Sequence, residues 1–301
     1  MTLFNKIDLY ASSEFNQLIS HQVQTALDED IGTGDLTAQL VPATQMVNAT
    51  IIVRESAIIC GIAWVNACFK KVDTNVEIIW HVVEGEHVSA NQLLCEINGS
   101  ARSLLTGERC ALNFLQTLSA TATETGKYVA AIAGTQAQIL DTRKTIPNLR
   151  LAQKYAVTVG GGHNQRLALY DGILIKENHI AAAGSIAAVM AKAFALNAEL
   201  GANTSAATSI QIEVENLSQL QEALIAGASS ILLDNFSLAL LSEAVTLNKK
   251  SEKPAILEAS GGITIDNVRT IALTGVDRIS IGAITKNVQA VDFSMRINGA
   301  N

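Results

Sequence analysis

Residues 141–180 read DTRKTIPNLRLAQKYAVTVGGGHNQRLALYDGILIKENHI, and the rest of the chain is organised around this stretch. One apolar run, AQILD at residues 137–141, leads into the stretch, and a second, GILIK at residues 172–176, lies near its end. Both runs have the length and composition of short buried strands. The stretch carries four cations: Arg143, Lys144, Arg166 and Lys176. Cations gathered at the carboxyl ends of strands predict a site for an anion.

Three consecutive glycines, residues 160–162, lie between these cations. Without side chains, their backbone N–H groups can approach an anion closely, or the chain can simply turn there. The sequence alone leaves both interpretations open.

The motifs DTRKT, KYAV, GGG followed by N-x-R, and LIKENHI occur in this order and spacing. As a set they resemble the quinolinate phosphoribosyltransferase family, over roughly residues 23–296. One position departs from the family pattern, which is usually N-H-R, because this chain has Asn164-Gln165-Arg166. The resemblance implies phosphoribosyl transfer from 5-phosphoribosyl 1-pyrophosphate (PRPP) to quinolinate with decarboxylation, giving nicotinate mononucleotide, pyrophosphate and CO2 in de novo NAD biosynthesis. It also implies Mg²⁺ as a cofactor and a homodimer.

The composition excludes several other classes of protein. With 301 residues, 49% of them hydrophobic, the chain can bury a sizeable core. A net charge of -7 argues against a general nucleic-acid-binding protein. The four cysteines share no CxxC spacing, which predicts buried free thiols rather than a metal site or disulfides. The N-terminus does not resemble a signal peptide, and the longest apolar run is too short for a membrane span, so we expect a cytoplasmic protein without a membrane partner.

Residues 1–117 predict an α+β domain, which the resemblance describes as an open-faced sandwich, with the tail at 289–301 packing on it. A helix is expected from Ser12 or Ser13 to about residue 28, because apolar residues recur there at helical spacing. The strand-like runs are NATIIVRES, VEIIWHVVEGE and QLLCEING, with a helical segment at 63–71. A long helix is expected from residue 104 to Gly134.

Residues 118–288 alternate strand and helix, which is typical of a β/α barrel or of an open doubly wound sheet. The resemblance favours an incomplete β/α barrel of seven strands. The uncharged segment at 201–209 is expected to be a surface loop. Helix starts are expected at Ser218 or Asn216 and at Thr264 or Asp266, and helix ends at Gly227 and Gly275. The strand-like cores are AQILD, GILIK, SIQIEVE, SSILLD, PAILEAS and DRISIG.

In a β/α barrel the functional groups lie at the carboxyl ends of the strands. Those ends carry Asp141, Glu215 and Glu258 besides the candidate site residues. So many cations in one mouth require a polyanionic ligand, and quinolinate with PRPP meets that requirement. With the resemblance, the candidate substrate-binding residues are Arg109, Thr142, Arg143, Lys144, Gln165, Arg166, Lys176, Glu213, Asp234, Ser260, Gly261, Gly262, Ser280 and Gly282. Four of these are the candidate catalytic residues: Lys144, Lys176, Glu213 and Asp234.

Glu213 and Asp234 are also the candidate Mg²⁺ ligands, directly or through pyrophosphate or water. They can instead hold the ribose hydroxyls or stabilise positive charge at the anomeric carbon. Glu215 follows Glu213 by two residues and therefore shares its side of an extended strand, so either can act. The resemblance favours Glu213. It also assigns the 5-phosphate of the ribose to the glycine-rich strand ends at 260–263 and 280–283, where glycines that serve only a turn are the alternative.

Arg109 lies within the expected long helix. From its spacing it is an exposed cation paired with Glu108 or Glu124. By resemblance it reaches the active site of the neighbouring subunit of the homodimer.

Three alternative functions remain at this point. The first is a phosphoribosyltransferase for another pyridine or related acid. The second is a Schiff-base aldolase that uses Lys176 as its nucleophile. The third is a non-catalytic anion-binding relative, which the amide of Gln165 favours. The implied transferase mechanism needs no protein nucleophile, because positioning and electrostatics suffice.

Overall fold

The fold is described from a computed structural model that covers residues 7–203 and 209–298. Residues 1–6, 204–208 and 299–301 lie outside the described part, and with them most of the segment expected as a surface loop. The chain forms two compact units. The first consists of the described parts of Met1–Gly126, Thr145–Gly161 and Ile284–Asn301, and the second of those of Lys127–Lys144 and Gly162–Ala283.

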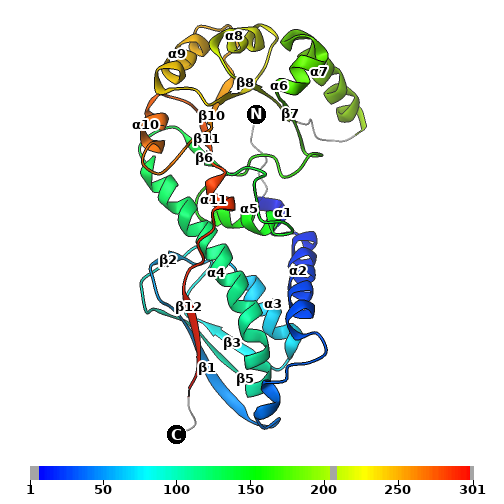
Figure 1. The fold of residues 1–301 in the computed structure, drawn as a ribbon, viewed down its shortest axis with the longest axis vertical. Coiled ribbons are helices and arrows are strands. Elements are labelled where there is room, and N and C mark those ends of the chain that lie inside the picture. The colour runs from blue at the N-terminus through cyan, green and yellow to red at the C-terminus, as the bar shows by residue number, and fades with distance from the viewer. Residues whose placement is uncertain (1–6, 204–208, 299–301) are drawn as a thin grey trace. The chain divides into compact units, whose positions relative to one another are not determined.

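An antiparallel sheet with the strand order β12-β1-β5-β3 is the framework of the first unit (Figure 1). The three strand-like runs predicted near the N-terminus overlap β1, β3 and β5. The fourth strand, β12, was not predicted, and it pairs with β1 from Ala49↔Ile297 to Val53↔Phe293. A separate short pair joins β2 to β4. The strands are β1 Met46–Val53, β2 Ala57–Ile58, β3 Glu77–Trp80, β4 His87–Val88, β5 Leu93–Ser100 and β12 Phe293–Ile297.

The helices predicted for this region are present. Ser12 begins the first long one, because its Oγ accepts a hydrogen bond from the backbone N–H of Phe15 at 3.2 Å. The helix at residues 150–159 was not predicted. The elements are α1 Ile7–Tyr10, α2 Ser13–Ile31, the 3-10 turn η1 Ala38–Leu40, α3 Ile62–Val72, α4 Ala101–Ala131, α5 Arg150–Val159 and α11 Ala283–Lys286.

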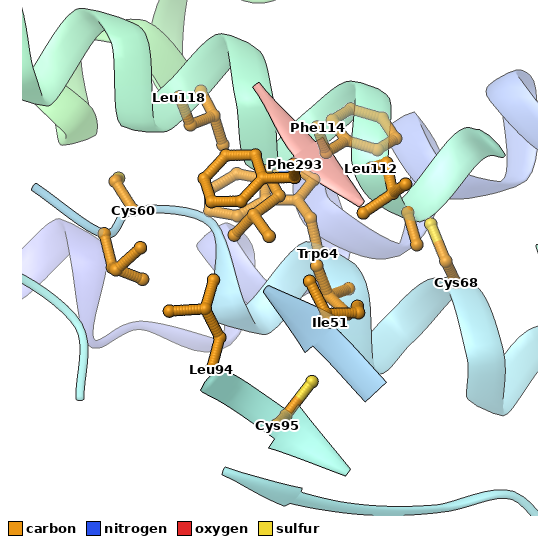
Figure 2. Close-up of a cluster of buried hydrophobic side chains, with 14 of the residues drawn as sticks. Ile51, Cys60, Trp64, Cys68, Leu94, Cys95, Leu112, Phe114, Leu118 and Phe293 are labelled. Carbon is orange, nitrogen blue, oxygen red and sulfur yellow. The ribbon is translucent and has the colours of Figure 1, made fainter. Parts of the chain in front are cut away.

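The core of the first unit surrounds the fully buried indole of Trp64 (Figure 2). Its Nε1 donates to Gln22 Oε1 at 2.9 Å, so the polar atom of this large apolar side chain is satisfied. All four cysteines are free and buried, as the sequence predicted. Burial raises the pKa of Cys68 and of Cys95 to about 12, which makes these thiols inert packing groups.

The second unit is built on a parallel sheet of six strands in the order β6-β11-β10-β9-β8-β7. All six predicted strand cores are present. At the β6 edge, His163 forms an isolated parallel bridge with Leu140. The strands are β6 Gln138–Leu140, β7 Gly172–Ile175, β8 Ser209–Val214, β9 Ser230–Asp234, β10 Ile256–Ser260 and β11 Arg278–Ser280.

Helices connect the strands and lie on the outer side of this sheet (Figure 1). Asn216 begins α8, because its side chain accepts from the N–H of Gln219 at 3.0 Å. The predicted start of α10 at Thr264 or Asp266 is wrong: Asn267 precedes its first residue, and the Asn267 side chain instead accepts from the N–H of Thr264. The helices are α6 Glu177–Ala183, α7 Ile186–Asn203, α8 Leu217–Ile225, α9 Leu238–Lys249 and α10 Val268–Leu273.

Two helix ends agree with the prediction. Gly227 and Gly275 directly follow the C-caps of α8 and α10 and have φ of +82° and +92°. Left-handed backbone at this position favours glycine, which is why the helices stop there.

Within residues 7–203 and 209–298, no single helix is long and apolar enough to cross a membrane. The pair α6 and α7, bent by 97°, passes that test together by length and composition alone.

Candidate functional site

The register of the parallel sheet aligns three candidate residues in one row at the carboxyl ends of adjacent strands. Asp234 on β9 is paired with Ser260 on β10, and Ser260 is paired with Ser280 on β11. Next to them, β6 ends at Leu140, the partner of Ser280, directly before the loop with the first two cations. The sheet therefore brings together polar groups that are far apart in the sequence.

Glycines follow this row directly after β10 and shortly after β11. Gly261 and Gly262 have φ of +97° and +61°. A Cβ on Gly261 would run into the side chain of Asn235. A Cβ on Gly282 would meet Lys144 Cδ at 3.0 Å and Thr142 Oγ1 at 3.4 Å, so a larger residue there would have to displace the Lys144 side chain.

Lys176 and Glu213 form an ion pair between the ends of β7 and β8. Lys176 Nζ lies 3.0 Å from Glu213 Oε2, and the two side chains are 45% and 13% exposed. Glu215 differs from Glu213 because β8 ends at Val214. The Glu215 side chain is exposed, and its N–H is bound to Gln219 Oε1. The pairing with Lys176 distinguishes Glu213 as the carboxylate at this strand end.

Arg143 and Arg166 lie close enough to affect one another. Burial lowers the pKa of Arg166, and the neighbouring positive charge of Arg143 lowers it further. Arg166 Nη1 donates to the carbonyl of Gly172 at 3.1 Å. Lys144 is exposed, and its N–H is bound to Thr142 Oγ1 at 3.0 Å. Two guanidinium groups held near one another favour an anionic ligand between them.

Asp141 is buried and fixes the segment that carries Gln165. One of its carboxylate oxygens accepts from Asn164 Nδ2 at 2.7 Å and the other from the N–H of Gln165 at 2.9 Å. The sequence placed Asp141 and Glu258 in the mouth, and this is wrong for both, because their exposures are 0% and 1%. Both carboxylates belong to the interior beneath the strand ends.

Gln211 is a polar residue of the interior that the sequence did not single out. It accepts from Gln165 Nε2 at 2.7 Å and donates to Glu258 Oε2 at 2.9 Å. In the sequence, Gln211 looks like an ordinary solvent-facing residue of a strand, because it is polar and uncharged. Its position two residues before Glu213, on the same face of β8, is the one feature that could have indicated a role near the site.

Asp234 is half-buried and accepts from Asn235 Nδ2 at 2.8 Å. No group of three or more His, Cys, Asp or Glu in the described ranges can hold a metal ion by itself. Mg²⁺ binds with one or two carboxylates and completes its shell with water and substrate phosphates. The carboxylates of Glu213 and Asp234 fit that donor set.

Arg109 lies on α4 in the first unit and is exposed. Among the described residues its side chain forms no hydrogen bond or ion pair, so the expected pairing with Glu108 or Glu124 is not observed.

Within the same unit, Leu36 and Leu40 are 81% and 84% exposed. Their segment is anchored to α4 one turn away, where Thr106 Oγ1 donates to Asp35 Oδ2 at 2.9 Å.

The glycine triplet has a structural reason in the first unit. A Cβ on Gly160 would run into the carbonyl of Ala122 and approach Thr125 Cβ at 2.8 Å. Gly161 has a φ of +84°. The close approach of α5 to α4 and the turn after it therefore account for these two glycines.

Comparison with known proteins adds independent findings. The chain matches a family model described as "Quinolinate phosphoribosyl transferase, C-terminal domain" over residues 121–296. It matches a second model, described as the N-terminal domain of the same family, over residues 35–119.

Individual relatives agree over nearly the whole chain. A probable nicotinate-nucleotide pyrophosphorylase (carboxylating) of Bacillus subtilis is 40% identical over 273 residues, which are 91% of this chain and 91% of that protein. A mitochondrial quinolinate phosphoribosyltransferase (decarboxylating) of Nicotiana tabacum is 34% identical and covers 92% of this chain and 81% of its own length. The solved structure of the nicotinate-nucleotide pyrophosphorylase from Francisella tularensis has a TM-score of 0.88 at 43% identity and covers 94% of this chain and 97% of its own.

Proposed function

Because the chain belongs to the quinolinate phosphoribosyltransferase family, we propose a role in that reaction for each residue of its candidate site. The protein is a pentosyltransferase of NAD biosynthesis. It transfers the phosphoribosyl group of PRPP to quinolinate with decarboxylation, and the products are nicotinate mononucleotide, pyrophosphate and CO2. The observation that carries this function is the family match, which spans residues 35–119 and 121–296.

Quinolinate binds to the guanidinium pair. Burial lowers the pKa of Arg166, and the positive charge of Arg143 lowers it further, so a dicarboxylate that binds both guanidinium groups relieves their repulsion. Each guanidinium offers a planar fork for a carboxylate. Gln165 adds an amide donor, which binds a carboxylate without carrying charge.

PRPP binds along the row of strand ends. Lys144, beside Thr142 and Gly282, supplies a point charge for pyrophosphate. Ser260, Gly261 and Gly262 offer hydroxyl and backbone N–H groups for the 5-phosphate, with Ser280 in register beside them. The two consecutive glycines at the end of β10, the second with open space around it, are the feature that supports phosphate binding.

Glu213 and Asp234 serve the ribose and the metal. Their carboxylates hold ribose hydroxyls and stabilise the positive charge that develops at the anomeric carbon. They are also the residues that would hold Mg²⁺, which neutralises pyrophosphate charge when it is bound. Lys176 keeps Glu213 in place through the 3.0 Å ion pair.

Catalysis requires no protein nucleophile. Pyrophosphate leaves as the bond at the anomeric carbon weakens, and the pyridine nitrogen then attacks that carbon. The ring nitrogen becomes cationic and stabilises the electron pair left on the adjacent carbon when its carboxylate leaves as CO2. A proton from water then takes the place of the carboxylate. The chain's residues orient both substrates and supply fixed charges, which lowers the barrier without a covalent intermediate. The 3.0 Å pairing with Glu213 also argues against Schiff-base chemistry at Lys176, because it engages the amine with a carboxylate rather than with a carbonyl substrate.

We further propose that the parallel sheet is an incomplete barrel of seven strands, with the segment at His163 as its seventh, because His163 bridges Leu140 at the β6 edge. We propose a homodimer in which Arg109 reaches the partner's site. The exposed Leu36 and Leu40, on a segment tied to α4, support an interface there. A cytoplasmic location accords with four reduced, buried thiols.

Turnover is the direct test. Purified protein is given quinolinate, PRPP and Mg²⁺, and nicotinate mononucleotide is measured together with CO2 from carboxyl-labelled quinolinate. We expect one CO2 for each nucleotide formed and a much lower rate with nicotinate, which lacks the second carboxylate. Equal rates with both acids would contradict a dicarboxylate site, and no product with quinolinate would contradict the function.

A further inference from the structure

Gln165 lies in a chain of three consecutive hydrogen bonds that runs from the candidate site into the interior of the second unit. Gln165 Oε1 accepts from the N–H of Arg166 at 2.7 Å, and Gln165 Nε2 donates to Gln211 Oε1 at 2.7 Å. Gln211 Nε2 then donates to Glu258 Oε2 at 2.9 Å. Gln211 is 7% exposed and Glu258 1%, so this is a buried polar network.

The groups at the two ends of the network fix the orientation of both side-chain amides. At one end the backbone N–H of Arg166 can only donate, which places the oxygen of the Gln165 amide against it. At the other end a carboxylate oxygen of Glu258 accepts, which places the nitrogen of the Gln211 amide against it. Each amide therefore has one orientation that satisfies both neighbours, and bonds aligned in this way strengthen one another.

Glu258 is well suited to anchor the network. Burial raises its pKa, and the groups that face it are Gln211, the hydroxyl of Ser280, the guanidinium of Arg278 and the carboxylate of Asp141. Gln211 is held further by a 3.2 Å hydrogen bond from its Nε2 to Ser230 Oγ. Both residues are buried, so an effect on binding has to pass through the residues that they hold. At the guanidinium end of the candidate site that residue is Gln165, which Gln211 contacts directly.

We propose that Gln211 and Glu258 are positioning residues, which fix the amide of Gln165 and the backbone of Arg166 for recognition of a substrate carboxylate. The inference rests on the proposed function, because that function identifies the ligand as a dicarboxylate. Rotation of the Gln165 amide by half a turn would present its oxygen to that carboxylate, and two acceptors would then repel. The network prevents this rotation.

A double-mutant cycle tests the proposal, with the dissociation constant for quinolinate measured by calorimetry without PRPP. Gln211→Leu removes all three hydrogen bonds of this side chain at nearly constant volume. Only the bond to Gln165 reaches the candidate site, so we expect binding to weaken about 3- to 10-fold, the range for one lost hydrogen bond. In a Gln165→Ala background the same change should weaken binding less than about 2-fold, because the residue it positions is gone. The matched control Gln221→Leu, at an exposed position on α8, should change nothing.

A second pair of variants keeps the test decisive if Gln211→Leu does not fold. Gln211→Glu keeps an acceptor for Gln165 but places a second buried carboxylate against Glu258. Adding Glu258→Gln replaces that carboxylate with an amide, which can donate to the new Glu side chain. We expect the single change to weaken binding and the double change to recover it to within about 2-fold of the wild type. Equal effects in the wild-type and Gln165→Ala backgrounds, or no recovery in the double variant, would overturn the proposal.

Turnover is measured separately, so the two conclusions can fail independently. If Gln211→Leu weakens binding only when Gln165 is present, and no nucleotide forms, the proposed function is contradicted and the positioning role is supported. If turnover is normal and Gln211→Leu weakens binding equally in both backgrounds, the function is supported and the positioning role is overturned. A wild type that does not bind quinolinate would overturn both. In steady state, Gln211→Leu should raise the KM for quinolinate and leave the KM for PRPP unchanged.

Discussion

At the scale of single residues, the site depends on how each cation is held. Arg166 is fixed through the carbonyl of Gly172, and Lys176 through Glu213, whereas Lys144 is exposed beside Gly282. Fixed guanidinium groups suit a rigid dicarboxylate, and a lysine on an open strand end suits the flexible pyrophosphate group.

Replacing Gln165 with His should preserve activity and add a pH dependence. A neutral imidazole can donate to Gln211 Oε1 and accept from the N–H of Arg166, which leaves it no donor for the substrate carboxylate. The loss of that one hydrogen bond should keep kcat/KM for quinolinate within about 10-fold of the wild type. The wild type should show no pH limb from residue 165, and the variant should gain one near the usual histidine pKa of about 6.5. The pH profile of kcat/KM measures both. Gln165→Leu is the control without hydrogen bonds, and a histidine variant inactive by several orders of magnitude would contradict this role.

Lys144→Met and Lys176→Met should each lower kcat by about 10² to 10³, as expected for a lost electrostatic group. Methionine keeps most of the aliphatic bulk, so the melting temperature should stay close to that of the wild type. Lys253→Met, at an exposed position before β10, is the matched control and should retain full activity. A large fall in melting temperature with normal activity in the remaining folded protein would indicate that the lysine is structural.

Glu258 should make stability depend on pH in a specific direction. Burial raises its pKa above the ordinary value of 4.5, so above that pH the unfolded chain loses a proton that the folded chain retains. Stability from this group is therefore fully present below the ordinary value and is lost as pH rises towards the folded pKa. The free energy of unfolding in urea, measured from pH 4.5 upward, should fall less steeply for Glu258→Gln than for the wild type. Parallel curves would show that Glu258 does not titrate in this range.

At the scale of elements, glycines decide how closely segments approach. Gly160 has an ordinary φ of -75°, but its missing Cβ lets α5 lie against α4. Gly227 has open space around it and a φ of +82°. Alanine should therefore be unfavourable at these two positions for different reasons.

Gly160→Ala should lower the free energy of unfolding by about 1–3 kcal/mol through overpacking. Gly227→Ala should lower it by about 1–2 kcal/mol through backbone strain alone. Asparagine separates the two causes, because it tolerates left-handed backbone: Gly227→Asn should recover much of the loss, and Gly160→Asn should recover none. Urea denaturation monitored by circular dichroism gives all four values. Recovery at position 160 would contradict the packing explanation.

Sequence patterns predicted the elements whose signals are local. The six strands of the second unit and the helices capped by Ser12 and Asn216 follow from apolar periodicity and capping residues. The helix α5 was missed because its buried face carries Gln153 and Lys154, both 0% exposed, so its pattern looks polar. Strand β12 was missed because it is short and includes an arginine, and only its pairing with β1 explains it.

The same distinction holds for the site. The charged residues at strand ends were identifiable, because their chemistry is evident in the sequence. Gln211 was not, since its partners Gln165 and Glu258 are 46 and 47 residues away and nothing local indicates them. The sequence also did not show that Glu258 is buried, because Glu258 lies only two residues before the end of β10 at Ser260.

At the scale of the whole molecule, the proposed dimer makes each active site depend on two chains. Arg109 belongs to the first unit, where it is exposed on α4, whereas Lys144 belongs to the second. Each single variant, Arg109→Ala or Lys144→Ala, should be nearly inactive. In a mixed dimer the two lesions fall in one site, and the other site keeps its own Lys144 and the partner's Arg109.

Mixing the two inactive variants should therefore restore activity. Random exchange of equal amounts gives mixed dimers for about half of the population, each with one intact site, so about a quarter of wild-type activity should return. The matched control mixes Lys144→Ala with Lys176→Ala, whose lesions affect the site of their own chain, and this mixture should stay inactive. Native mass spectrometry of differently tagged chains establishes that exchange has occurred. If mixed dimers form and no activity returns, Arg109 serves its own chain or only the surface, and the site is not shared between subunits.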